Sequence, residues 1–288
     1  MSRRSLAWGA LCVALAHGGP PSALSQIVGP NFPLSVPPCA KVENEPSLVA
    51  QGNHLLAVIR GECIATVRAS VSRDAGSTWQ DASVMPWNGI PEPPIAACSG
   101  DSGRFYVVTP TIVLGEGNTI EVVEGRFVGS SFQWQRLTNP VPTPYAAGSL
   151  LRPSAVDIGF EPYSGNLLVV YTHVTTAPGG SSRNHSIKVV RSTDGGGTWE
   201  EPIELTGPES DFGRVVFGLN GELSVVWENF VLRKIVRRQS SNGGASYGPE
   251  EEIDSIRDNF AVEPAGWLSS YNRSNPAFPF GRTMEAPA

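Results

Sequence analysis

An eight-residue pattern recurs three times in this sequence, each time after a short strand-like run. It has Ser at the first position, Asp or Asn at the third, Gly at the fifth, Thr or Ser at the seventh and an aromatic residue at the eighth. The copies contain Ser72, Asp74, Gly76, Thr78 and Trp79; Ser192, Asp194, Gly196, Thr198 and Trp199; and Ser240, Asn242, Gly244, Ser246 and Tyr247. Self-similarity of this kind predicts a fold built from stacked repeats.

The chemistry of the pattern favours a tight hairpin turn, which we call the signature turn. The side chain of Asp74, Asp194 or Asn242 is short enough to accept hydrogen bonds from N–H groups of its own turn. The glycine two residues later supplies a positive φ, and the aromatic side chain covers the hairpin with apolar surface. We therefore expect these residues to be structural rather than catalytic.

Apolar runs before each signature turn predict further strands at residues 46–50, 54–59 and 65–71; 153–157, 166–171 and 186–191; and 213–217, 221–227 and 232–238. Residues 105–108 and 120–123 look like strands of another unit, whose turn at 130–134 has lost the pattern, and residues 259–263 and 266–271 look like the start of a fifth. A unit of about 48 to 60 residues with roughly four strands is typical of a propeller blade. The predicted fold is an all-β propeller of four-stranded blades over residues 46–274, with four blades and the beginning of a fifth, followed by an irregular tail at 275–288.

The composition agrees with many short strands and turns, because the 288 residues include 31 Gly and 25 Pro and only 17% are charged. The formal net charge of −6 makes nucleic acid and anionic membranes poor partners. The four histidines have no metal-ligand spacing, and we expect no cofactor or metal.

The first 25 residues have the pattern of a secretory signal peptide. Arg3 and Arg4 precede an apolar run that is too short to span a bilayer, and Ala23 and Ser25 are small residues at the spacing that a signal peptidase needs. The paired arginines leave both the general secretory and the twin-arginine routes open. We expect a secreted or periplasmic protein with a lead-in segment at 26–45 and no transmembrane segment after signal removal. Cys39, Cys63 and Cys98 then remain, so at most one disulfide with one free thiol is expected, with the pairing open.

The signature turns resemble those of the BNR, or Asp-box, family, whose best-known members are the sialidases, six-bladed propellers that cleave terminal sialic acid. The resemblance covers residues 46–272 and implies a sialidase-like propeller. It also implies that Asp74 and Asp194 lie at the periphery, away from the centre of the ring. A sialidase centre would further need three arginines for the substrate carboxylate, a tyrosine nucleophile with a glutamate, and an aspartate.

This chain departs from that pattern, since residues 44–48 hold no arginine where the family has a Phe/Tyr-Arg-Ile-Pro segment. The candidate catalytic residues are Arg152, Glu263 and Tyr271, and the candidate binding residues are Arg60, Arg214 and Arg273. The predicted blades are fewer than the six of a sialidase. Three explanations for this difference stay open: an incomplete product, closure with partners, or very short blades.

Two functions from different classes follow. The first is an exported module that binds a glycan or a cell-surface protein without clear catalytic residues. The second is a glycoside hydrolase of the sialidase superfamily with a diverged or incomplete active site. A truncated, non-functional paralogue is a third possibility, and whether the protein is an enzyme stays undecided at this level.

Overall fold

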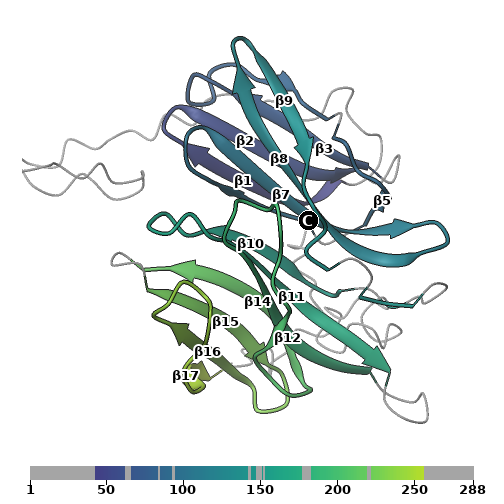
Figure 1. Ribbon diagram of the computed structural model, residues 1–288, viewed down its shortest axis with the longest axis vertical. Helices are drawn as coiled ribbons and strands as arrows, with labels where there is room; N and C mark the ends of the chain where they lie inside the picture. Colours follow the sequence, from purple (N-terminus) through teal and green to yellow (C-terminus); the bar gives the residue numbers. More distant parts are fainter. Residues whose placement is uncertain are drawn as a thin grey trace, which may run out of the picture.

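The computed structural model describes residues 43–61, 66–83, 85–92, 95–141, 144–146, 151, 153–176, 183–218 and 222–255. These residues form an all-β propeller of four blades, each an antiparallel sheet (Figure 1). Within this part of the chain, no helix is long and apolar enough to cross a membrane. The predicted signal peptide, the start of a fifth blade and the tail lie outside the described residues.

Each blade is a meander in which the strands follow chain order from the inner edge to the outer edge. Blade 2 departs from this, since two short strands, β5 and β6, both pair with β7. Blade 1 contains β1 (Glu43–Gln51), β2 (His54–Gly61), β3 (Thr66–Ser72) and β4 (Gln80–Asp81). Blade 2 contains β5 (Ile90–Pro91), β6 (Ala96–Ser99), β7 (Arg104–Val113), β8 (Gly117–Val128) and β9 (Ser131–Arg136). Blade 3 contains β10 (Val156–Phe160), β11 (Leu167–Thr176), β12 (Arg183–Ser192) and β13 (Ile203–Glu204), and blade 4 contains β14 (Ser210–Phe217), β15 (Leu223–Asn229), β16 (Lys234–Ser240) and β17 (Glu251–Ser255).

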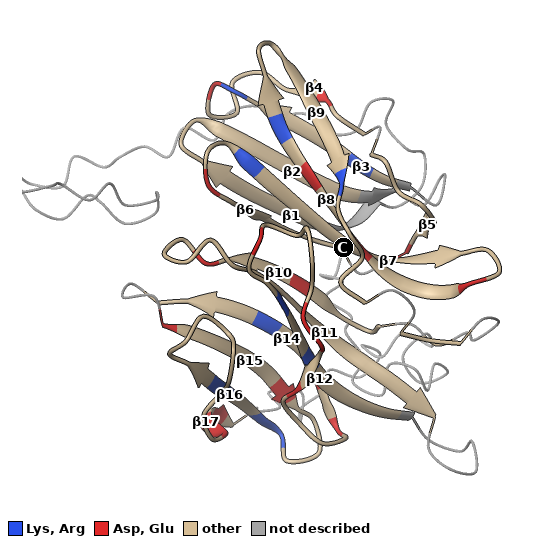
Figure 2. Cartoon of the chain, viewed as in Figure 1, with Lys and Arg blue, Asp and Glu red and all other residues tan. Residues whose placement is uncertain are grey.

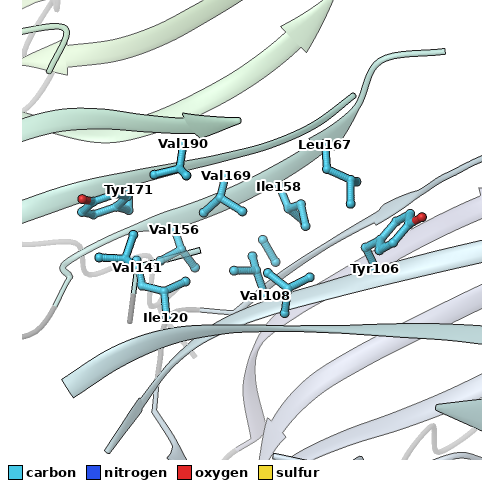
Figure 3. Close-up of a cluster of buried hydrophobic side chains, with 12 residues drawn as sticks. Tyr106, Val108, Ile120, Val141, Val156, Ile158, Leu167, Val169, Tyr171 and Val190 are labelled. Carbon is cyan, nitrogen blue, oxygen red and sulfur yellow. The ribbon is translucent and has the colours of Figure 1, made fainter. Parts of the chain in front are cut away.

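The blades pack face to face because alternate residues of each strand point to opposite neighbours. Between blades 2 and 3, Tyr106 and Val108 of β7 meet Leu167 and Val169 of β11 in one buried cluster (Figure 3). The next residues along β11, Leu168 and Val170, point the other way and pack against blade 4. A strand that is buried on both faces has apolar residues at consecutive positions, which explains the sequence of β11.

The inner strands of the four blades share a register. Ser47, Ala96, Asp157 and Arg214 each pair with a valine on the second long strand of their blade: Val58, Val108, Val170 and Val226. Two of these inner-strand side chains bond the next blade. Ser47 Oγ accepts from Ala97 N at 3.2 Å, and Asp157 Oδ2 accepts from Val215 N at 2.9 Å. The inner strands of blades 1 and 2, and those of blades 3 and 4, are thus joined by a side-chain acceptor as well as by apolar packing.

Within blade 3 and within blade 4, ion pairs connect the two outer strands to each other. Lys188 and Glu204 lie 3.4 Å apart between β12 and β13, while Arg237 and Glu251 lie 2.9 Å apart between β16 and β17. Figure 2 shows acidic and basic residues interleaved over the blades rather than gathered by sign. Such half-exposed pairs contribute little stability individually, so the short outer strands depend mainly on backbone pairing and packing.

Candidate functional site

A buried carboxylate, Asp211, gathers polar side chains from blade 3 at the start of β14. This end of blade 3 is opposite its signature turn, because β12 runs from the Asp211 region near His185 to the turn at Ser192. Asp211 Oδ1 accepts hydrogen bonds from Ser154 Oγ at 2.8 Å, from Thr172 Oγ1 at 2.8 Å and from Phe212 N at 2.7 Å, and Asp211 Oδ2 lies 3.2 Å from His185 Nδ1. We call Ser154, Thr172, His185 and Asp211 the Asp211 cluster.

The backbone at Asp211 is unusual. The register of β14 shifts between Asp211 and Arg214, and Phe212 has a φ of 59°. Glu209, just before the strand, has a φ of 86°. Gly213 lies in the same bulge. A Cβ there would lie 2.7 Å from Val170 Cγ1, so a larger residue would clash at this position. Positive φ in residues other than glycine is uncommon and persists where the surrounding structure demands it, often at functional sites.

The cluster keeps Asp211 ionised. Burial opposes ionisation, but the hydrogen bonds, that from His185 foremost, outweigh it and hold the pKa of the Asp211 carboxyl below its ordinary 3.8. The His185 side chain is 21% exposed, so its ring is accessible from outside. Phe230 stands edge-on to that ring, with 6.0 Å between the centroids. The site therefore combines a fixed negative charge, an accessible imidazole and an aromatic ring.

A second histidine lies at the same end of blade 3. His173 stacks on Tyr145 with the ring centroids 5.3 Å apart, and Tyr145 Oη accepts a hydrogen bond from Val174 N. Burial lowers the pKa of His173, and the Lys188 cation acts in the same direction. Burial raises the pKa of Tyr145 to about 12. Both rings are thus held neutral near pH 7, and the pair presents an aromatic rather than a charged surface.

Of the six candidate residues from the sequence, Arg214 has a described side chain. It is exposed on β14, and its Nη1 donates to the carbonyls of Val156 and Gly213. The backbone of Arg60 lies in β2, but its side chain is outside the described residues, as are Arg152, Glu263, Tyr271 and Arg273. The expected grouping of arginines around a tyrosine therefore remains a prediction.

The signature turns all have the hydrogen bonds that their chemistry favours. Asp74 Oδ1 accepts from Thr78 N and Asp194 Oδ1 from Thr198 N, while Asn242 Oδ1 accepts from Ser246 N at 3.0 Å. Hydrogen bonds, from the threonine side chain and backbone above all, lower the pKa of Asp74 and of Asp194 to about 2. Cys98 is a free thiol, while Cys39 and Cys63 lie outside the described residues.

The Asp211 cluster was not predicted from the sequence, because its members come from four separate segments. Asp211 follows His185 by 26 residues, a separation that no motif links. The available signal was Ser210-Asp211 before the apolar part of a predicted strand, which alone is common in loops. Within the described part of the chain, no group of three or more His, Cys, Asp or Glu side chains is arranged to hold a metal ion.

No protein-family model matches the chain, and no curated protein sequence matches it. Among solved structures, an α-L-arabinanase of Penicillium chrysogenum in complex with arabinobiose is 15% identical, with a TM-score of 0.48, and the match covers 73% of this chain and 66% of the arabinanase. A thermostable family-43 glycoside hydrolase is 12% identical, with a TM-score of 0.46 and coverage of 76% and 74%. A Hadza microbial sialidase is 12% identical, with a TM-score of 0.45, and this chain spans 46% of its length. These likenesses concern the fold and carry no information on ligand or activity.

Proposed function

We propose that this protein is an exported propeller that binds a glycan at the Asp211 cluster and does not hydrolyse it. The observation that carries the proposal is the engagement of Asp211, whose Oδ1 accepts three hydrogen bonds and whose Oδ2 faces His185. A carboxylate held ionised in this way orients an imidazole and supplies negative charge. It holds no proton for a leaving group at neutral pH, as a general acid would need to.

A sugar suits the chemistry of this site. A sugar ring has hydroxyl groups around its edge and apolar C–H groups on its faces. The contact with Asp211 occupies Nδ1 of His185 and leaves Nε2 to bond a hydroxyl. The neighbouring Phe230 ring supplies apolar surface of the kind that ligand sites combine with a few placed polar groups.

Glycoside hydrolysis is the second candidate, and a specific observation favours it. Glu209 is an exposed acid two residues from Asp211, its φ is positive, and its carbonyl accepts a hydrogen bond from Phe230 N. Glycosidases generally use two carboxyl groups on either side of the scissile bond. Asp211 and Glu209, two residues apart in the sequence, would be the two acids of that arrangement.

The test is binding of the chain from residue 26 to 288 to an array of glycans that includes sialosides and arabino-oligosaccharides, followed by calorimetric titration of the glycan bound. We expect His185→Ala and Asp211→Asn to weaken binding at least about tenfold, since a lost charge-assisted hydrogen bond costs about 1.5–3 kcal/mol. His54→Ala is the matched control, because His54 lies at the beginning of β2 in blade 1. Binding to no glycan would overturn the proposal. Cleavage of a fluorogenic sialoside or arabinofuranoside that is lost in Glu209→Gln would instead establish the hydrolase.

A further inference from the structure

Blade 1 and blade 4 each have one face on which no other described strand packs extensively. The described strands that pack on blade 1 belong to blade 2, those that pack on blade 4 belong to blade 3, and the two end blades lie apart (Figure 1). On the free face of blade 4, Val216 of β14 is 50% exposed, and on the free face of blade 1, Leu48 of β1 is 64% exposed. A repeat unit of this kind buries its apolar face by stacking on a neighbour.

The described interfaces show which inner-strand residues meet between neighbouring blades. The residues paired with the equivalent valines align the four inner strands at Ser47, Ala96, Asp157 and Arg214. Between blades 3 and 4, the residue two positions after this reference meets those one and three positions after it in the next blade. A Cβ on Gly159 would lie 2.6 Å from Val215 Cγ1 and 2.6 Å from Phe217 Cε2.

The same spacing holds at the other two interfaces. Between blades 2 and 3, Cys98 packs in one cluster with Ile158 and Phe160, and between blades 1 and 2, Val49 packs in one cluster with Ala97. The side chains are complementary in size. Glycine or cysteine stands opposite residues that include a phenylalanine, whereas the larger valine stands opposite an alanine. Packing density in a protein interior demands such compensation.

This spacing matches Val216 on the free face of blade 4 with Leu48 and Ala50 on the free face of blade 1. Val216 is two positions after Arg214, and Leu48 and Ala50 are one and three positions after Ser47. The sizes are again complementary, because a valine stands opposite a leucine and a small alanine. All three side chains are exposed in a single copy of the chain.

We infer that two copies of this chain associate head to tail, with the free face of blade 4 of each copy on the free face of blade 1 of the other. Two such contacts, related by a twofold axis, close a ring in which each copy supplies four blades. A second copy covers both free faces at once, through a contact of the type that the chain already makes between its own blades.

Arg214 makes this interface differ from two of the others. At the same position Ser47 and Asp157 accept an N–H of the following inner strand, but a guanidinium only donates. Its Nη1 already bonds the carbonyls of Val156 and Gly213 within the copy. The contact between copies therefore depends on apolar packing at Val216 rather than on a side-chain acceptor.

Sedimentation equilibrium of the chain from residue 26 to 288 measures the mass in solution and the dissociation constant of the dimer. We expect a dimer, and we expect Val216→Asp and Leu48→Asp each to raise the dissociation constant at least about tenfold, because each puts a charge into an apolar contact. Val128→Asp is the matched control, since Val128 is a valine of similar exposure, 43%, at the end of β8 in blade 2, and it should leave the constant unchanged.

The fold of each variant is checked at Cys98, a thiol whose pKa is raised by burial and which should stay unlabelled by maleimide. Val216→Cys combined with Leu48→Cys tests the register. Mild oxidation should give a covalent dimer in which mass spectrometry finds position 216 of one copy joined to position 48 of the other. Val128→Cys combined with Leu48→Cys is the control and should form no such bridge.

Three results would overturn the inference: a monomer at every concentration, a dimer that survives Val216→Asp, and a bridge between positions 48 and 216 of one chain. A monomer would leave the free faces bare or covered by the chain itself. A dimer that is weakened by Val216→Asp but not by Leu48→Asp would place blade 4 against blade 4, and it would overturn the head-to-tail arrangement as well.

Discussion

Asp157 on β10 and Val215 on β14 are joined by a hydrogen bond of 2.9 Å, from the backbone N–H of Val215 to the carboxylate of Asp157. Ser47 and Ala97 make the equivalent contact between blades 1 and 2. Burial raises the pKa of Asp157, and the hydrogen bond from Val215 only partly offsets this. The folded protein thus holds a proton on this carboxyl at a higher pH than the unfolded chain does.

Asp157→Asn is expected to stabilise the protein at neutral pH. An acid whose pKa is raised on folding loses stability as the pH rises from its unfolded value of 3.8 through the folded value. The amide keeps an acceptor for Val215 without a buried charge. Urea unfolding should therefore show the variant to be more stable than the wild type at about pH 7, and the two to be similar at about pH 3.5.

Asp157→Ala is the control for the acceptor itself. It leaves the Val215 N–H without its partner and should cost about 1–3 kcal/mol at about pH 3.5. The cost should be smaller at about pH 7, where the substitution also removes the buried charge. A wild type that is more stable than Asp157→Asn at neutral pH would show instead that the ionised carboxylate is favoured in the folded state.

The Asp211 cluster predicts the opposite pH dependence. The pKa of Asp211 is lowered on folding, so its stabilising contribution is present above 3.8 and is lost as the pH falls through the folded value. We expect Asp211→Asn to be about 1.5–3 kcal/mol less stable at neutral pH, with a smaller difference in acid. Circular dichroism melts across pH would measure this.

Glu209→Gln is the matched control for that experiment, because Glu209 is an exposed acid two residues away. It should change stability by less than about 0.5 kcal/mol, as surface substitutions usually do. A loss of stability in Asp211→Asn that does not change with pH would contradict the ionised state of Asp211.

Local patterns predicted the blades well, because strand alternation and turn chemistry act within a few residues. The runs at 54–59 and 166–171 became β2 and β11. The eroded turn predicted at 130–134 was misplaced, because residues 131–134 belong to β9 and the turn from β8 lies at 129–130. The inner strand of blade 2 was missed. Its sequence, Ala96-Ala97-Cys98-Ser99, is short and weakly apolar, and it is a strand because β7 and the neighbouring inner strands surround it.

The candidate site depended on contacts that no local pattern encodes. Ser154, Thr172 and His185 reach Asp211 because blades 3 and 4 pack together, and the bulge at Phe212 re-aims the start of β14. The arginines proposed from family resemblance were chosen by residue type alone. Arg214, the one with a described side chain, proved to bond backbone carbonyls.

Gly213→Ala tests whether the bulge sets the site. A Cβ at this position would lie 2.7 Å from Val170 Cγ1, between blades 3 and 4. Overpacking of this kind costs about 1–3 kcal/mol. The shift should also move Asp211 and weaken glycan binding. Gly207→Ala, where a Cβ would meet no atom within 4 Å, is the control and should leave thermal stability and binding unchanged.

The signature turns allow a test by exchange of their third residue. Asp194 and Asn242 make the same bond to a backbone N–H, from Thr198 and Ser246 respectively. Asp194→Asn should therefore lower the melting temperature less than Asp194→Ala, which removes the acceptor altogether. Because hydrogen bonds lower the pKa of Asp194 to about 2, the wild-type advantage over Asp194→Asn should be present above 3.8 and disappear as the pH falls towards 2. Identical melting curves for the alanine and asparagine variants would show that the side-chain acceptor does not stabilise the turn. A wild type that melts like Asp194→Asn at every pH would show that the carboxylate charge does not stabilise it.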